Sequence, residues 1–162
     1  MPNIHVINSP YAPPAQLQGW QWLPYNNKIM LDVVKRAVSI IDKQIKGTKP
    51  CEAAFTALPG GNSFSNIWKQ ANIWISYDPD RTGIRYGVTL NMQHVSITGY
   101  VLAMGEWMTA ATIIHELAHV NGAPGNDTQA EDTLLKCMLK QHHNPNIIGL
   151  LRSKKLKNNA LA

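Results

Sequence analysis

Charged side chains are scarce in this chain, and long apolar runs are missing from it. Only 15% of its 162 residues are Asp, Glu, Lys or Arg, whereas 44% are hydrophobic. This composition excludes an intrinsically disordered polypeptide and gives one domain enough apolar surface for a core. No apolar run approaches the roughly 18 residues that cross a bilayer, so the sequence predicts no transmembrane segment.

The first residues also lack the features of a classical secretion signal. Residues 1–5 (Met-Pro-Asn-Ile-His) contain neither a basic region nor the apolar segment that follows one. We therefore expect a protein that stays in the cytoplasm or reaches its target by a specialised secretion route.

Cysteine is rare, with only Cys51 and Cys137 in the chain. Their wide separation excludes a zinc knuckle and a thioredoxin-like redox pair, which need cysteines a few positions apart. A disulfide fits an oxidising compartment and two buried thiols fit a reducing one. The sequence leaves both states open.

Positive charge exceeds negative charge, with a net charge of +5 and an isoelectric point near 9.3. Part of the excess lies near the C-terminus, at Arg152, Lys154, Lys155 and Lys157. Aromatic residues are not interleaved with basic ones in the way that RNA-binding sheets require. We therefore expect a solvated basic tail over residues 146–162 and no nucleic-acid partner.

Hydrophobic periodicity and turn residues divide the rest of the chain into an arm and one domain. Residues 1–25, rich in Pro, Asn and Gln, are expected to form an extended arm that docks through its aromatic residues. Residues 26–145 are expected to fold as a single domain with helices at both ends. Its expected elements are a helix over 27–46, a short helix after Pro50, a turn capped by Ser63, strands over 72–77, 84–90 and 93–97, a helix over 106–120 and a last helix over 128–142.

The most informative motif is His115-Glu116-Leu117-Ala118-His119, within the expected helix over 106–120. Residues four apart lie on one face of a helix, so the two imidazoles can converge on one cation. Glu116 lies about 100° further round the helix, where its carboxylate reaches a metal-bound water rather than the metal. The motif predicts a hydrolase that binds Zn²⁺ through His115 and His119 and uses Glu116 as general base.

The flanks of this motif favour a metal site over two surface histidines. Between Met108 and Val120, Glu116 is the only residue of a permanently charged type. An exposed helix normally carries several Lys, Arg or Glu residues on its outer face. We therefore expect a buried helix, whose imidazoles and carboxylate need partners inside the protein.

The order of helix, small sheet, motif helix, glycine turn and second helix resembles the zincin metallopeptidases over residues 72–143. The resemblance implies an α+β fold in which a small, mostly antiparallel sheet packs on the active-site helix. It also implies a peptide or protein substrate, which in zincins pairs as an extended chain with the edge strand of the sheet. Residues 51–137, with Leu58-Pro59-Gly60-Gly61 and the segment 119–125, also resemble predicted metallopeptidase domains of bacterial rearrangement-hotspot (Rhs) toxins. That narrower resemblance implies an effector and a cognate inhibitor, or immunity protein, as its partner.

The motif alone does not fix the third zinc ligand, and catalytic zinc normally takes three protein ligands. Glu131 is the first candidate, because gluzincins carry a glutamate on the helix after the motif helix. Asp127 is the alternative, because aspzincins carry an aspartate after a glycine turn. Metzincins place their third ligand three residues after the motif glycine, where this chain has Gly125, so a metzincin site is not expected.

Three further side chains stay open for the third position: Asp132, His142 and His143. The acids also have ordinary roles at the start of a helix, because Glu131 completes a capping box with Thr128 and Asp127 suits an N-cap. Both histidines suit the C-terminal end of the last helix, where the helix dipole favours cations.

The predicted reaction is hydrolysis of a peptide bond by a metal-activated water. Tyr77, Tyr86 and Tyr100 are candidates to stabilise the oxyanion, although tyrosines in a sheet region are more often part of the core or the surface. Two other functions fit the same residues. One is a zinc amidase or endopeptidase that cleaves peptidoglycan, and the other is a non-enzymatic metal-binding module.

Overall fold

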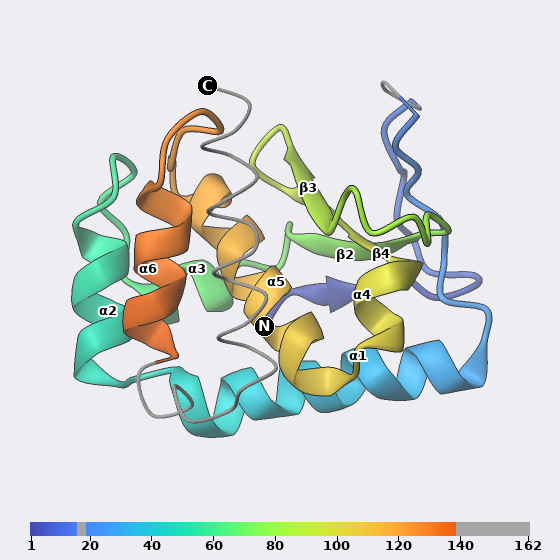
Figure 1. Cartoon of the computed structure of the whole chain (residues 1–162), viewed down its shortest axis with the longest axis horizontal. Coiled ribbons are helices and arrows are strands. Elements are labelled where there is room, and N and C mark those ends of the chain that lie inside the picture. The colour runs from blue at the N-terminus through green and yellow to red at the C-terminus, as the bar shows by residue number, and fades with distance from the viewer. Residues whose placement is uncertain (16–18, 139–162) are drawn as a thin grey trace.

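The computed structural model describes residues 1–15 and 19–138, and Figure 1 shows the path of the chain. These residues form an α+β fold, as predicted, with a four-stranded sheet. The strands are β1 (Asn3–Ile4), β2 (Trp74–Asp78), β3 (Gly87–Leu90) and β4 (His94–Thr98). The helices are α1 (Lys28–Ile40), continued by a π-helical segment (Ile41–Ile45), α2 (Lys49–Thr56), α3 (Phe64–Trp68), α4 (Gly99–Ala103), α5 (Glu106–Val120) and α6 (Gln129–Cys137). Among the helices of this part of the chain, none combines the length and the apolar character of a membrane span.

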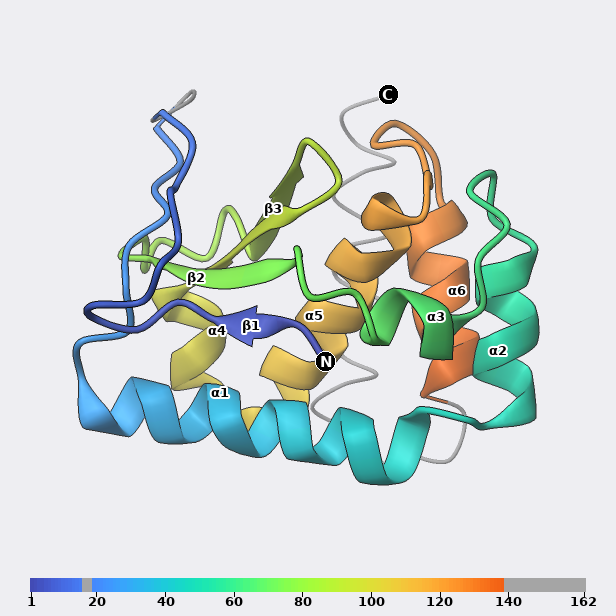
Figure 2. The ribbon, with the colours of Figure 1, turned by 180° about the vertical axis from the view of Figure 1, so that it is seen from behind.

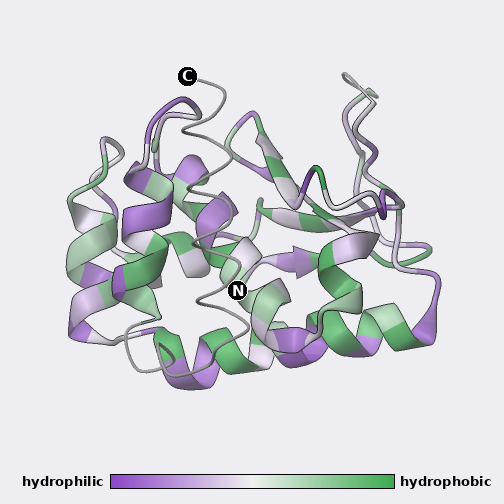
Figure 3. Cartoon of the chain, viewed as in Figure 1, coloured by the Kyte–Doolittle hydropathy of each residue, from purple (hydrophilic) through white to green (hydrophobic). Residues whose placement is uncertain are grey.

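The helices predicted from periodicity and capping residues are present. Helix α1 begins where Asn27 accepts hydrogen bonds from two backbone N–H groups, and α3 begins where the Ser63 hydroxyl accepts one. Figure 3 shows the apolar and polar bands that alternate along α1. Helix α4 is not predicted, because five residues are too few to show a period. The basic tail, His142 and His143 lie outside the described residues.

The sheet is mixed, which corrects the prediction of a mostly antiparallel sheet. Its strand order is β1-β2-β4-β3, and only β3 and β4 are antiparallel, whereas β1 with β2 and β2 with β4 are parallel. A mostly antiparallel sheet would pair β2 with β3, the strand that follows it in the sequence. Residues 79–86 instead carry the chain past β4, so that β3 forms the edge of the sheet (Figures 1 and 2).

Burial explains why β4 takes the central place. Val95 and Ile97 of β4 are completely buried, whereas every residue of β3 is partly exposed. A central strand is covered by neighbours on both edges, so the more apolar strand is stabilised most in that position. Asn91 and Met92, both at positive φ, close the β3–β4 hairpin that the sequence predicts. This left-handed turn geometry matches the twist of the paired strands.

Different parts of the chain cover the two faces of the sheet. The residues that point towards the helices are completely buried: Ile75, Val95 and Ile97. The opposite face bears hydroxyl groups that contact residues 1–25. Ser76 Oγ lies 3.2 Å from His5 Nδ1, and Ser96 donates a hydrogen bond of 2.6 Å to the Gln21 carbonyl. The expected arm thus supplies strand β1 and polar contacts to the sheet.

Helix α5 lies between the sheet and the pair formed by α2 and α6 (Figures 1 and 2). Twelve of its fifteen residues are buried, which confirms the prediction of a buried helix. A disulfide joins Cys51 on α2 to Cys137 on α6. Of the two cysteine states that the sequence leaves open, the structure contains the disulfide.

Candidate metal centre

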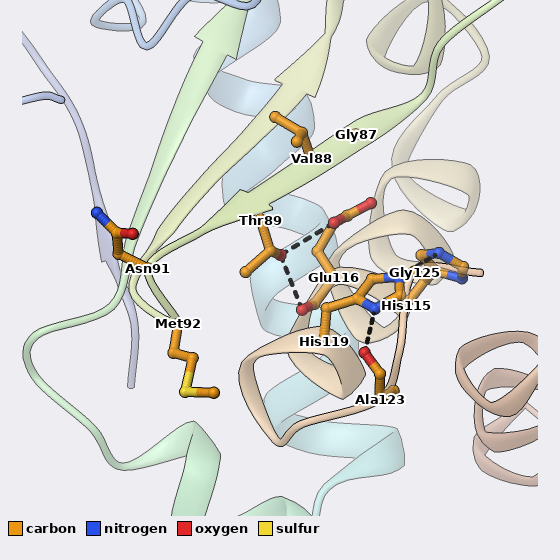
Figure 4. Close-up of a pocket in the computed structure, with 10 residues that line it drawn as sticks. All are labelled: Gly87, Val88, Thr89, Asn91, Met92, His115, Glu116, His119, Ala123 and Gly125. Carbon is orange, nitrogen blue, oxygen red and sulfur yellow. Dashed lines mark hydrogen bonds between the residues drawn. The ribbon is translucent and has the colours of Figure 1, made fainter. Parts of the chain in front are cut away.

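The last turns of α5 bring the three motif side chains to one wall of a pocket. Only 7% of His115 and 3% of Glu116 is exposed, and His119 is partly buried. The pocket has a volume of about 500 Å³ (Figure 4). Its walls come from α5, strand β3, the tip of the β3–β4 hairpin and the turn after α5.

The two imidazoles face each other through one nitrogen each. Nε2 of His115 lies 3.1 Å from Nε2 of His119. His119 Nδ1 lies 2.8 Å from the backbone carbonyl oxygen of Ala123, which can only accept. Nδ1 therefore carries a proton, and neutral His119 presents the lone pair of Nε2 to His115. Two nitrogen ligands of one tetrahedral zinc ion lie about 3.3 Å apart, so the observed separation fits a shared cation.

The glycine turn that ends α5 fixes the acceptor for His119. Gly122 has a φ of 86°, the left-handed geometry that the sequence predicts at this position. The Ala123 N–H donates to the Ala118 carbonyl at 2.9 Å, while the Ala123 carbonyl accepts from His119. The group that orients the second histidine is thus a backbone carbonyl, which no pattern of side chains could reveal.

Asn121 ties the end of α5 to the segment between α2 and α3. Its side-chain amide donates to the carbonyls of Phe55 and Asn62, both at 2.8 Å. The Gly60 N–H donates to the Asn121 carbonyl, and a Cβ at position 60 would lie 2.5 Å from Asn121 Oδ1. The segment Leu58-Pro59-Gly60-Gly61 therefore packs closely on the motif helix because a glycine leaves room for it.

Glu116 points towards strand β3. Thr89 Oγ1 lies 2.9 Å from both Glu116 Oε2 and the Glu116 backbone carbonyl oxygen (Figure 4). A Cβ at Gly87 would lie 2.8 Å from Glu116 Oε1. Sequence reasoning missed both β3 residues. An isolated glycine in a strand is a signal of close backbone approach, whereas nothing local links Thr89 to a glutamate 27 positions away.

Among the candidate acids, Glu131 lies beside a motif histidine. Its Oε1 is 3.8 Å from His115 Nδ1. A carboxylate there favours a proton on Nδ1, which leaves Nε2 to face His119. Within residues 1–15 and 19–138, no three His, Cys, Asp or Glu side chains are grouped closely enough to hold a metal ion. The structure thus brings Glu131 to the histidines without placing its carboxylate at the paired nitrogens.

The other two acids serve the start of α6. Asp127 accepts a hydrogen bond of 2.9 Å from the Gln129 N–H, and Asp132 accepts one of 3.1 Å from the Thr128 hydroxyl. Thr128 makes no side-chain capping hydrogen bond, so the threonine half of the capping box considered for Glu131 is missing. The Thr128 hydroxyl instead donates its hydrogen bond to Asp132, the acid that follows Glu131 in the sequence.

No family model matches this chain, and no curated protein or solved structure is detectably similar to it. Its function has to be inferred from the groups around the pocket. Two imidazole nitrogens at a separation that suits one cation, with a buried carboxylate beside them, can bind a divalent metal and accept a proton from water.

The tyrosines considered for the oxyanion are absent from the described lining of the pocket. Tyr86 and Tyr100 stack with ring centroids 5.7 Å apart, and Tyr77 packs against Tyr25 at 5.9 Å. Burial, with a smaller contribution from Tyr100, raises the pKa of Tyr86. These contacts give the three side chains a packing role beside the sheet.

Proposed function

We propose that the protein is a zinc-dependent metallopeptidase of the zincin type, which hydrolyses peptide bonds. The observation that carries the proposal is the facing pair of Nε2 atoms, 3.1 Å apart, with the Glu116 carboxylate on the wall of the same pocket. Buried imidazoles and carboxylates are stable only with partners of matching chemistry. A zinc ion and its bound water are such partners.

His115 and His119 would hold the zinc ion through Nε2, and Glu131 is the acid proposed to complete the site. The Ala123 carbonyl lies beside the other nitrogen of His119, and the Glu131 carboxylate lies 3.8 Å from that of His115, from which it would have to turn towards the metal to serve as a ligand. Such acceptors fix the tautomer that leaves Nε2 for a metal. Asp127 is the weaker candidate, because it already accepts a backbone N–H at the start of α6.

The chemistry divides between the metal and Glu116. Bound zinc would lower the pKa of its water and polarise the scissile carbonyl. Glu116 is the group that accepts the proton of the attacking water and passes it to the leaving amine. Its 3% exposure keeps bulk water away from this proton transfer.

The position of β3 supports an extended peptide as the substrate. Strand β3 is the edge of the sheet and contributes Gly87, Val88 and Thr89 to the pocket. Within the described residues it pairs with β4 along one side only. An edge strand offers backbone N–H and C=O groups to a peptide, and neighbouring pockets then select its side chains.

Substitution of Glu116 tests the proposed roles. Glu116→Gln should abolish peptide cleavage, because the amide cannot accept the water's proton, while zinc content stays near one equivalent. His115→Ala should lose both zinc and cleavage. Cleavage of casein and elemental analysis measure the two properties, and a Gln variant with wild-type turnover would contradict the assigned base.

A matched pair of acids tests the third ligand. Glu131→Gln should weaken zinc binding, whereas Asp127→Asn should leave the zinc affinity almost unchanged. Loss of an acceptor that merely orients a ligand typically costs about 10- to 100-fold in metal affinity. A larger loss for Glu131→Gln identifies a ligand, and a loss within that range identifies an orienting residue.

A non-enzymatic metal-binding module is the second candidate, because the described residues contain no assembled group of three ligands. Stoichiometric zinc without turnover of any peptide substrate would favour it. Parallel zymograms with casein and peptidoglycan separate a protease from a peptidoglycan amidase or endopeptidase.

We further propose that the peptidase is a bacterial effector with an inhibitor partner. The support is the segment Leu58-Pro59-Gly60-Gly61, which resembles Rhs toxin domains and packs against the end of the motif helix. Expression of the wild type and of Glu116→Gln in bacterial cytosol and periplasm tests the effector role. Equal growth of both strains in both compartments would contradict it.

A further inference from the structure

We propose that strand β3 positions the general base Glu116 through two neighbouring residues, Thr89 by its hydroxyl and Gly87 by its lack of a side chain. This inference rests on the proposed peptidase function. Residues two apart in a strand point to the same side, so positions 87 and 89 both face one turn of α5. Thr89 is thus a positioning residue and not a catalytic one.

The hydroxyl of Thr89 meets Glu116 at two points. Thr89 Oγ1 lies 2.9 Å from the carboxylate oxygen Oε2 and 2.9 Å from the backbone carbonyl oxygen of the same residue. A hydroxyl has one proton, so the two acceptors share it. A hydrogen bond to an ionised carboxylate is about twice as strong as one between neutral groups. This bond therefore restricts the rotamer of a side chain that otherwise has three rotatable torsions.

Gly87 acts by the space that it leaves. A Cβ at this position would lie 2.8 Å from Glu116 Oε1 and 3.0 Å from Thr112 Cγ2, one turn earlier on α5. A real Cβ cannot approach those atoms so closely, so any larger residue would displace the carboxylate or the strand. Glycine is needed here for the close approach of β3 to α5.

The pairing of β3 makes these two contacts important for the position of the strand. Gly87 is opposite Ile97 and Thr89 is opposite Val95, both on β4. The other side of β3 has no neighbouring strand within the described sheet. Contact with α5 through Thr89 therefore fixes the distance between the strand proposed to receive the substrate and the base proposed to activate water.

The first test compares Thr89→Val with Thr89→Ser. Valine keeps the shape and loses the hydroxyl, so kcat should fall roughly 10- to 100-fold, the range expected for a hydrogen bond to a charged group. KM and zinc content should stay near wild type, and serine should restore most of kcat. Thr56→Val, which removes a 2.9 Å hydrogen bond from the exposed Thr56 hydroxyl to the Glu52 carbonyl within α2, is the matched control and should leave kcat unchanged.

The second test does not depend on activity. In the metal-free protein, the side-chain carboxyl ¹³C signal of Glu116, assigned by its absence from Glu116→Gln, should shift in Thr89→Val and in Gly87→Ala. It should stay in place in Thr56→Val. An unshifted signal in Thr89→Val overturns the inference even when no substrate has been found.

The two proposals can fail separately. Wild-type protein without peptidase activity contradicts the proposed function, while a shifted Glu116 signal still supports the contact with β3. Wild-type kcat in Thr89→Val, together with an inactive Glu116→Gln, overturns the role of Thr89 and leaves the peptidase intact.

Discussion

Helix α5 is held on its two sides by different kinds of bonds. On the helical side, the disulfide joins α2 to α6, and the buried amide of Asn121 binds the segment that follows α2. On the strand side, β3 meets the motif through the hydroxyl of Thr89 and the close approach of Gly87. A covalent bond and the buried amide of Asn121 thus secure one side, whereas a hydroxyl and an edge strand secure the other.

This difference matches what each side would have to do. The metal ligands proposed on α5 and α6 need a fixed separation, because small displacements spoil coordination geometry. A strand that receives a peptide needs an edge that a second chain can approach. We therefore expect damage on the helical side to destabilise the fold, and damage on the strand side to lower turnover with little loss of stability.

Removal of the disulfide should give the largest loss of stability, because it removes the covalent link on the helical side of α5. Cys51→Ala combined with Cys137→Ala opens a loop whose ends are 86 positions apart, which should lower the free energy of unfolding by about 4 kcal/mol. Zinc affinity should fall too, because α6 carries Glu131. Urea denaturation with and without a reductant measures the loss. Reductant should destabilise only the wild type, since the double variant has no cysteine.

Asn121→Ala should cost somewhat less, about 3 kcal/mol of unfolding free energy. The side chain is 1% exposed, and its removal deprives two carbonyls of their donors, each at about 1–3 kcal/mol when buried. Thermal unfolding measures the change, and Asn66→Ala on the exposed face of α3 is the control, with a change below about 0.5 kcal/mol. A variant of Asn121 that loses turnover but no stability would contradict the contrast between the two sides.

Acidification should lower the stability of the protein less than either substitution does. It should act on the face of the sheet that contacts residues 1–25. Burial lowers the pKa of His5, partly offset by a hydrogen bond to the Leu23 backbone, and burial also lowers the pKa of His94. Unfolded imidazoles titrate near pH 6.5, so below that value the unfolded chain binds more protons than the folded one. The stability contributed by neutral His5 and His94 is therefore complete well above pH 6.5, declines as the pH falls below that value, and is gone below the lowered pKa values of the folded state.

The melting temperature of the wild type should consequently fall by a few degrees from pH 7.5 to 5.5. The fall should be smaller for the variant His5→Asn with His94→Gln. Hydrogen exchange locates the effect, because the protection factor of the His5 N–H, which donates to the Ile75 carbonyl, should fall at the lower pH. An equal fall of the protection factors in α6 would show that the whole fold responds rather than the contact between residues 1–25 and the sheet.

Local patterns predict the helical part of this protein well. The apolar stripe of α1 follows from spacings of three or four residues, the cap at Ser63 from its hydroxyl, and the burial of α5 from the scarcity of charged residues between Met108 and Val120. The same spacing places the two motif imidazoles on one face of α5, which is why their convergence could be predicted. The turn at Gly122 follows from the conformational freedom of glycine.

Contacts between segments far apart in the sequence determine the strand order and the surroundings of the motif. Local sequence patterns do not reveal such contacts. Strand β4 lies between β2 and β3 because its side chains are the more deeply buried, and a short apolar run does not disclose its neighbours. Thr89 looks like an ordinary strand residue until the fold brings it to Glu116. The acceptor for His119 is a backbone carbonyl, which every residue possesses.

The disulfide encloses every residue that the structure places in the lining of the pocket, from Gly87 to Gly125, and Glu131 as well. A peptidase is exposed to its own activity, and a cut at any bond between the two half-cystines would leave both pieces in a single covalent molecule. Self-processed protein would migrate as one band on a non-reducing gel and as two bands after reduction. The nicked molecule would also keep the proposed metal-binding wall assembled, so cleavage within the ring need not abolish its activity.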